Sequence, residues 1–409
     1  MNRRRILTCG LASMGACAAN ISSIALSDET TSPAPPRSRS LIAKLSQFLW
    51  RSQSDDGRWS SSTYALLRSG QALTPFVLST LLKANAMNRD TEQANMAKKW
   101  ILAQLRGGAL GLSDAEVLEY PVFASAFAMS CLVLLDSPEH DAPIAALRRF
   151  LLNQQLVETR GFKPSDLAYG GWGFGGVHAP GQSGHMDLSH TRWALTALSA
   201  SAAGADSRPY QSKAQRFLRL VQKCPDEDRE VPLDDGHGGG NIVQHNPPYD
   251  GGFYFSPIVL AANKGRLQRA GDRSYVRSYA TATCDGVMAL LAAGVHPHEE
   301  RILSARHWLE ANPDWEYPAG IPKDYPEPWG DAVYFYHQAV RAEAYRSLGI
   351  RGDWAERLIE RLHTHLQRDG SIINQRSPLM KENDPILCST LALIAATNAE
   401  ATNGVQGVN

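Results

Sequence analysis

The sequence lacks the features that would place it in several common classes of protein. It has 6 Cys in 409 residues, too few for a scaffold held together by disulfides. Lys plus Arg number 41 and Asp plus Glu number 41, so the chain has no general basic field and we expect no nucleic-acid partner. Beyond residue 30, no run of about 18 apolar residues predicts a membrane span. No Gly-x-Gly-x-x-Gly motif follows a strand pattern, so we expect no dinucleotide cofactor.

The chain is nevertheless apolar enough to fold around a core, because 43% of its residues are hydrophobic. Two of the cysteines, Cys9 and Cys17, lie in the N-terminal segment. The remaining four are far apart in the sequence, and three lie in apolar runs. We therefore expect buried free thiols at Cys131, Cys224, Cys284 and Cys388.

Residues 1–27 are predicted to be an export signal. Arg3, Arg4 and Arg5 precede a weakly apolar stretch, and small residues surround position 27, where cleavage is expected. The Arg-Arg-x-Ile-Leu pattern resembles a twin-arginine signal, which implies an exported, periplasmic or extracytoplasmic protein. An uncleaved anchor and lipidation at Cys17 are the alternatives, and peripheral contact with a membrane fits this address. Residues 28–39 read as a Pro- and Ser-rich linker.

A repeat of one helical plan dominates residues 40–400, with residues 401–409 expected as a flexible tail. In each copy an amphipathic helix ends in an aromatic-Leu pair and a Gln, and a Gly-containing turn follows. The first copy runs from Phe48 to Trp59 through Gln53. Further copies contain Gln155 with Trp172 and Gln222 with Phe253, and looser copies contain Gln104, Asn312 with Trp315, and Gln367.

A second helix in each copy is apolar almost all round, as a helix buried on several sides must be. These helices are expected near residues 73–84, 122–135, 189–202, 281–293, 332–348 and 386–396. Outer polar helices and inner apolar helices in equal number predict an all-α fold, an (α/α)6 toroid in which ring closure buries the inner faces.

The repeat resembles the QW motif of squalene and terpenoid cyclases across nearly all of residues 40–400. The same double ring serves the β-subunits of protein prenyltransferases, and the chain resembles exported bacterial proteins with prenyltransferase and squalene-oxidase repeats. The resemblance implies that each Gln ties one helix end to the next turn under a Trp. It also implies a hydrophobic, isoprenoid-like ligand in the central cavity.

Two catalytic motifs of these families are altered in this chain. Squalene cyclases carry Asp-x-Asp-Asp-Thr, whereas this chain has Asp187-Leu188-Ser189-His190-Thr191, so squalene-type protonation is not expected. Prenyltransferases bind Zn²⁺ with Asp-x-Cys and a later His. His337 matches that His, but Val287 stands at the Cys position if Asp285 is aligned with the Asp. We expect no metal, and a zinc site of Cys284 or Asp285 with His337 is the alternative.

The candidate site follows from the toroid, because the N-terminal ends of its inner helices line the cavity. We expect Asp187 and His190 to carry the chemistry, assisted by Asp285, Asp331 and His337. Four aromatic residues are candidates for substrate binding: Trp172, Trp193, Phe253 and Tyr334. Each has an ordinary alternative, since Asp187 and Asp331 could cap helices and the aromatics could fill the core.

Three functions compete on the sequence. The first is a cyclase-like protein that binds or transforms a hydrophobic small molecule. The second is a carbohydrate-active hydrolase or lyase with an acidic pair drawn from Asp187, Asp285 and Asp331, since such enzymes also use (α/α)6 rings. The third is a binding or scaffold module without catalysis, which the missing acid pair favours.

Overall fold

The structure, a computed structural model, describes residues 36–84, 90–112, 119–201, 208–227, 229, 231–234, 240–243, 249–270, 273–313 and 315–406. The predicted export signal and most of the predicted linker lie outside these ranges, as does most of the loop at residues 234–240. None of the helices described is both long enough and apolar enough to cross a bilayer.

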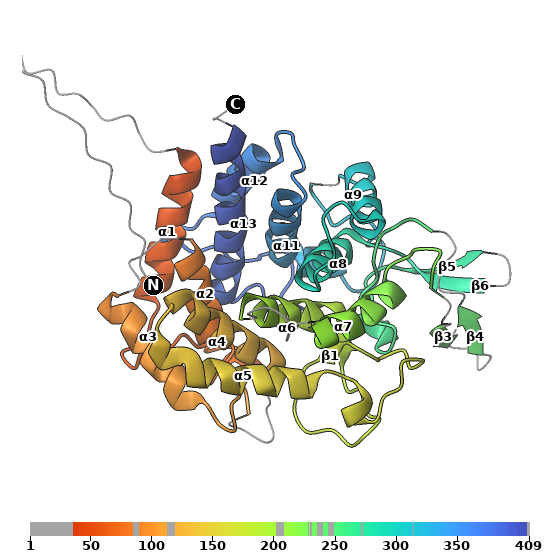
Figure 1. The fold of residues 1–409 in the computed structure, drawn as a ribbon. Coiled ribbons are helices and arrows are strands. Elements are labelled where there is room, and N and C mark those ends of the chain that lie inside the picture. The colour runs from red at the N-terminus through yellow and green to blue at the C-terminus, as the bar shows by residue number, and fades with distance from the viewer. Residues whose placement is uncertain are drawn as a thin grey trace, which may run out of the picture. The chain divides into compact units, whose positions relative to one another are not determined.

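Helices alternate along the chain between an outer and an inner ring (Figure 1). The outer helices are α1 Arg37–Arg51, α3 Glu92–Gln104, α5 Asp141–Gln154, α7 Arg208–Val221, α9 Glu300–Ala311 and α12 Trp354–His365. The inner helices are α2 Leu73–Lys83, α4 Pro121–Leu135, α6 Leu188–Ala200, α8 Ala280–Ala292, α11 Tyr334–Ser347 and α13 Pro385–Gln406. Each inner helix packs against the next, and α13 packs against α2, which closes the ring.

Shorter elements connect these helices. The 3-10 turns are Ala65–Leu67, Pro138–His140, Glu158–Arg160 and Leu260–Ala262, and the short helix α10 Trp329–Ala332 precedes α11. Antiparallel hairpins pair β1 Trp172–Gly173 with β2 Met186–Asp187, β3 Val231–Asp234 with β4 Gly240–Val243, and β5 Leu267–Ala270 with β6 Arg273–Val276. The helical pattern does not predict these hairpins, which interrupt an otherwise all-α toroid.

The distribution of apolar residues explains the two rings. On α12 the residues Trp354, Leu358 and Leu362 are buried, while Glu356 and Glu360 face solvent. Inner helices such as α4 are instead apolar around most of their circumference. The predicted (α/α)6 toroid is therefore confirmed, and so are the buried free thiols at Cys131, Cys224, Cys284 and Cys388.

Both ends of the toroid extend beyond the boundaries expected from the sequence. Helix α1 starts at Arg37, inside the predicted linker, and α13 continues to Gln406, inside the predicted tail. The two helices pack together, and Ser38 and Arg39 bond to the carboxylate of Glu400. The first and last helices of the toroid therefore stabilise each other, a contact that the repeat pattern does not predict.

A glutamine clamp joins successive repeats. Gln155 Nε2 donates to Gly170 O at 3.0 Å and to Tyr210 O, in the first turn of α7, at 3.0 Å. Gln53 bonds in the same way to Gly57 O and Gln93 O, and Gln222 bonds to Gly251 O and Arg301 O. One side chain therefore holds its own turn and the next outer helix, as the QW resemblance implies.

The aromatic residue of each turn completes this junction. Trp172 donates Nε1–H to Leu151 O at 2.7 Å, and its backbone N–H bonds to Thr191 Oγ1 at 3.0 Å. Phe253 makes the same backbone bond to Thr283 Oγ1, at 3.1 Å. Both rings are fully buried between helices. The structure thus places two predicted substrate-binding residues, Trp172 and Phe253, in the junctions between repeats.

Candidate functional site

Three of the predicted polar side chains lie on neighbouring inner helices: Asp187 and His190 at the start of α6, and Asp285 on α8. Asp187 is the N-cap of α6, and its Oδ1 accepts the backbone N–H of His190 at 2.9 Å. Its Oδ2 lies 2.8 Å from His190 Nδ1 and 3.3 Å from His185 Nδ1. We refer to Asp187 and His190 as the dyad. One carboxylate therefore caps the helix through Oδ1 and contacts the His190 ring through Oδ2.

The charge of Asp187 determines which ring nitrogen of His190 carries a proton. Burial alone would raise the pKa of Asp187, but the charge of His190 and hydrogen bonds from His185 and His190 outweigh it, so the pKa lies well below its usual value. An ionised carboxylate only accepts hydrogen bonds, so His190 Nδ1 carries a proton toward it. In the neutral ring Nε2 is then a lone pair, and it is buried without a hydrogen-bond partner among the described residues.

Aromatic side chains surround the dyad. Phe123 of α4 stacks on His190 with ring centroids 3.7 Å apart and an interplanar angle of 9°. Phe174 lies 4.8 Å and Tyr120 6.4 Å from the same ring, centroid to centroid. Phe123, Phe174 and Tyr120 are only partly buried. They give the dyad an apolar surround that retains some exposed surface.

A buried network continues from this end toward the middle of the ring. Ser189 Oγ lies 2.6 Å from Tyr336 OH, which lies 2.9 Å from Asp285 Oδ2. Arg192 donates Nη1–H to Asp285 Oδ1 at 2.8 Å and Nη2–H to Glu343. We refer to Ser189, Arg192, Asp285, Tyr336 and Glu343 as the axial network. It joins α6, α8 and α11, and the guanidinium of Arg192 donates to both carboxylates.

Burial has the largest effect on the pKa of Asp285 and raises it to about 6. The charge of Arg192 and hydrogen bonds from Arg192 and Tyr336 lower the pKa but only partly oppose this effect. Burial also raises the pKa of the Tyr336 phenol well above its usual value. The two candidate carboxylates therefore differ, since Asp187 is held ionised and Asp285 retains a proton up to mildly acidic pH.

Lys264 adds a buried amine that the sequence patterns do not reveal. Its Nζ lies 5.0 Å from the ring centroid of Phe255 and 5.2 Å from that of Trp329. Burial lowers the pKa of Lys264 to about 8, while the charges of Asp187 and Asp285 act in the opposite direction. The amine thus contributes positive potential between the dyad and the axial network. It follows an irregular segment, so no periodicity points to it.

Glu382 is a second residue that the sequence patterns miss. Its carboxylate accepts the backbone N–H groups of Phe335 and Tyr336 at 2.9 and 2.8 Å, at the start of α11. Burial raises the pKa of Glu382 to about 7, although these backbone bonds and Asn374 lower it. A carboxylate from a distant loop therefore orients the first turn of α11, which carries Tyr336.

His337 is close to the axial network but separate from the dyad. Its Nδ1 lies 3.2 Å from Thr281 Oγ1, and its Nε2 is buried without a hydrogen-bond partner among the described residues. Burial and the charge of Arg341 hold the pKa of His337 well below its usual value. Within the part of the chain that the structure describes, no three His, Cys, Asp or Glu side chains form a group able to hold a metal.

Asp331 and Tyr334 face a different part of the molecule. Asp331 lies in α10 and pairs with Arg376 at 3.4 Å, whereas α10 takes Pro328 as its N-cap residue. Tyr334 lies beneath the guanidinium of Arg376, whose Cζ is 4.2 Å from the ring centroid. The structure therefore brings Asp187, His190 and Asp285 to the ring centre and places Asp331 and Tyr334 beside Arg376.

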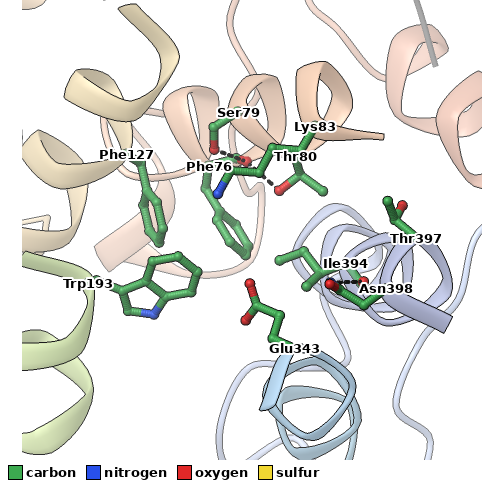
Figure 2. Close-up of a pocket in the computed structure, with 10 residues that line it drawn as sticks. All are labelled: Phe76, Ser79, Thr80, Lys83, Phe127, Trp193, Glu343, Ile394, Thr397 and Asn398. Atoms are coloured by element: carbon green, nitrogen blue, oxygen red, sulfur yellow. Dashed lines mark hydrogen bonds between the residues drawn. The ribbon is translucent and has the colours of Figure 1, made fainter. Parts of the chain in front are cut away.

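A small cavity occupies the ring centre toward the C-terminal ends of the inner helices (Figure 2). Its volume is about 40 Å³, room for water, whereas ligand pockets measure roughly 300–1,000 Å³. Trp193, a predicted substrate-binding residue, lines it. The complete lining is Phe76, Ser79, Thr80, Lys83, Phe127, Trp193, Glu343, Ile394, Thr397 and Asn398. This cavity is too small to enclose an isoprenoid chain in the conformation described.

Solved structures with the same architecture include two kinds of enzyme. The type II terpene cyclase MstE from Scytonema, solved with geranylgeranyl dihydroxybenzoate as substrate, matches with a TM-score of 0.53 and 12% identity over 90% of this chain and 98% of its own. The family 76 glycoside hydrolase (mannosidase) Bt3792 from Bacteroides thetaiotaomicron matches with a TM-score of 0.51 and 11% identity over 91% and 100%.

A family 76 α-1,6-mannanase from Salegentibacter gives a TM-score of 0.52 at 8% identity, over 90% of this chain and 99% of its own. No protein-family model and no curated protein sequence matches the chain. Identities this low establish architecture alone. The chain therefore has the α/α toroid fold that terpene cyclases and family 76 glycoside hydrolases share.

Proposed function

We propose that this chain is an exported toroid that binds a hydrophobic small molecule over the N-terminal ends of its inner helices and exchanges a proton with it through the dyad. The observation that carries the proposal is the unpartnered, buried Nε2 of His190, held beside Phe123 and fixed by an ionised Asp187. A His oriented by a carboxylate and left with one open nitrogen is a typical acid–base group.

The dyad limits the chemistry that the ligand can undergo. An imidazolium is too weak an acid to protonate an isolated alkene, so the ligand needs a more basic or more acidic atom, such as a hydroxyl or a carbon beside a carbonyl. His190 Nε2 would take that proton, and Asp187 would stabilise the imidazolium that forms. Lys264, whose amine feels the charges of both Asp187 and Asp285, would stabilise negative charge that develops on the ligand.

The size of the central cavity limits where such a ligand could bind. A volume of about 40 Å³ excludes an isoprenoid from the space next to Trp193 and Glu343. Among the described residues, the partly exposed rings of Tyr120, Phe123 and Phe174 give the ligand an apolar surface beside the dyad. The substrate that MstE takes supports an isoprenoid-bearing compound as the first class to test.

The test is proton exchange catalysed by the purified protein. The lipid extract of the exported fraction is incubated with the protein in D₂O, and mass spectrometry follows deuterium entry into individual lipids. Wild type should label or convert one apolar compound, and His190→Gln should reduce that rate about 100-fold or more. His307→Gln, an exposed change on α9, is the matched control. Equal rates in all three proteins would reject the dyad as the catalyst.

A glycoside hydrolase is the second candidate, because Asp187 and Asp285 have pKa values displaced in opposite directions, as an acid and a base require. Against it, Asp285 is fully buried and already bonded to Arg192 and Tyr336. Hydrolysis of α-1,6-mannotriose by wild type, lost in both Asp187→Asn and Asp285→Asn, would favour this candidate over the first.

A further inference from the structure

The junction between the fifth and sixth repeats departs from the glutamine clamp. Asn312, which stands in the Gln region of the fifth copy, donates Nδ2–H to Trp308 O of its own helix at 2.8 Å. Trp59 and Trp172 are fully buried in their junctions, whereas Trp315 is only partly buried. Because Asn312 does not bridge to any described residue of the next repeat, part of the Trp315 ring stays accessible at this junction.

A groove of about 530 Å³ lies at this junction. It is lined by Trp315, Glu316, Arg341, Arg357, Leu358, Glu360, Arg361, Thr364, His365 and Arg376. Four of the lining residues are arginines and two are glutamates, so positive charge is in excess although the whole chain is neutral. Its volume is within the range of small-molecule sites, roughly 300–1,000 Å³.

Aromatic rings hold two of the four arginines of this groove in place. Arg341 is 3% exposed, and its Cζ lies 4.0 Å from the ring centroid of Trp315. Arg376 lies over Tyr334, with Cζ 4.2 Å from the centroid. Stacking leaves the edge of each guanidinium, where its N–H groups lie, directed sideways toward acceptors.

Internal acceptors satisfy these arginines to different degrees. Arg341 Nη2 donates to Gln338 Oε1 at 2.7 Å, and Arg361 forms a two-pronged ion pair with Glu316. Arg357 pairs with Asp353 at 2.7 Å. Arg376, in contrast, has its carboxylate partner Asp331 at 3.4 Å, longer than a charge-assisted hydrogen bond of about 2.7–2.9 Å.

We propose that this groove binds the oxyanion group of a small molecule, a phosphate or a carboxylate. Arg376 and Arg361 would donate to its oxygens, and Trp315 would pack against its apolar part. Guanidinium forks match the geometry of both groups, and the groove supplies several forks on a pre-ordered aromatic base. Glu316 must turn toward solvent, which its exposed side chain allows. This site contains neither residue of the dyad, so the proposal does not depend on the function proposed for the dyad.

His365 provides a local probe of the proposal. Burial lowers the pKa of His365, and the charges of Arg376 and Arg361 lower it further. The rings of Tyr334 and Phe335 lie 5.8 and 5.3 Å away, centroid to centroid, and Glu316 and Glu360 share the groove. An anion bound between Arg361 and Arg376 would offset their charges, so the imidazole should titrate at a higher pH in its presence.

The experiment uses the whole exported protein, with inorganic phosphate and succinate as separate probes. Isothermal titration in sulfate-free buffer gives the dissociation constants, and side-chain NMR spectra follow His365, assigned with His365→Gln. We expect saturable binding of at least one probe, an upward shift of the His365 titration midpoint, and about tenfold or greater weakening by Arg376→Gln. Arg306→Gln, which removes an arginine from α9 outside the groove, should leave the affinity unchanged.

The two probes distinguish the sources of the oxyanion. Preference for phosphate assigns a phosphorylated ligand, and preference for succinate assigns a carboxylated one. Absence of saturable binding by wild type would overturn the proposal, and so would equal weakening by Arg376→Gln and Arg306→Gln, which would mean that only general charge attracts the anion. Unchanged thermal unfolding of Arg376→Gln confirms that a loss of binding is not a loss of folding.

Discussion

At the scale of single residues, the dyad combines a structural and a chemical role in one carboxylate. Asp187 caps α6 through Oδ1 and fixes His190 through Oδ2. The altered Asp-Leu-Ser-His-Thr run points to both residues, because Asp and His stand one helical turn apart. The stacking of Phe123 on His190 has no signature in the sequence, since Phe123 lies within an apolar run that predicts only a buried helix.

Replacing Asp187 should separate the two roles. Asp187→Asn keeps an oxygen for the cap but removes the charge, so unfolding free energy should fall by about 1 kcal/mol or less while proton exchange falls to the level of His190→Gln. Asp187→Ser, another good cap, should likewise fold and fail in exchange. Urea denaturation and the deuterium assay measure the two effects. Full exchange activity in Asp187→Ser would show that the carboxylate serves only as a cap.

Two buried carboxylates should make stability depend on pH in an unusual direction. Asp285 and Glu382 have pKa values raised to about 6 and about 7, against about 4 in an unfolded chain. The folded protein therefore binds more protons between these limits, and stability decreases as pH rises through them. Asp187 and His337 act in the opposite sense. The lowered pKa of Asp187 removes stability as pH falls below about 4, and the lowered pKa of His337 removes stability as pH falls below about 6.5.

Thermal unfolding measured from pH 4.5 to 8 tests this dependence. Because Glu382→Gln cannot ionise, its unfolding temperature should rise relative to that of wild type as the pH increases from 5.5 to 8. Glu360→Gln, on the exposed face of α12, is the matched control and should leave the curve unchanged. A difference between Glu382→Gln and wild type that stays constant from pH 5.5 to 8 would show that Glu382 ionises without cost.

At the scale of elements, the repeat pattern predicts the helices closely and the connections poorly. The spacing of apolar residues places α2, α4, α6 and α8 within one or two residues of their observed ends. It misses the short hairpins, such as β1 with β2, because two-residue strands carry no period. It also treats residues 332–348 as one helix, whereas α10 ends at Ala332 and α11 begins at Tyr334.

The glutamine clamp should be a main source of stability between repeats. Gln155→Ala removes both donors and leaves the carbonyls of Gly170 and Tyr210 buried without them, which should cost about 2–4 kcal/mol of unfolding free energy. Gln182→Ala, in an exposed turn, should change it by less than about 0.5 kcal/mol. Urea denaturation compares them. Similar small effects in both variants would mean that water replaces the clamp.

At the scale of the whole molecule, ring closure brings together residues that no local pattern connects. Arg192, Asp285 and Glu343 come from α6, α8 and α11, and their meeting depends on the toroid rather than on spacing. The sequence therefore predicts which helix ends carry polar groups but not which of them touch. Asp331 illustrates the limit, since it precedes an inner helix and is a sequence candidate for the ring centre, yet it pairs with Arg376.

Removing the central guanidinium should destabilise the whole ring. Arg192→Met leaves the buried Asp285 and the partly buried Glu343 without their cation, which should cost about 3–5 kcal/mol. Adding Asp285→Leu and Glu343→Leu to that variant removes the stranded charges and should restore much of the loss. Denaturant unfolding of the single and triple variants measures this. A triple variant no more stable than Arg192→Met would show that packing, not charge, sets the cost.

The most direct measurement is native mass spectrometry of wild type and Phe123→Ala, both purified from the source cell. We predict that wild type retains one apolar compound at a stoichiometry near one and that Phe123→Ala, folded but without the ring that covers His190, releases most of it. An empty wild-type ring, or equal occupancy in both proteins, would contradict a hydrophobic ligand held beside the dyad.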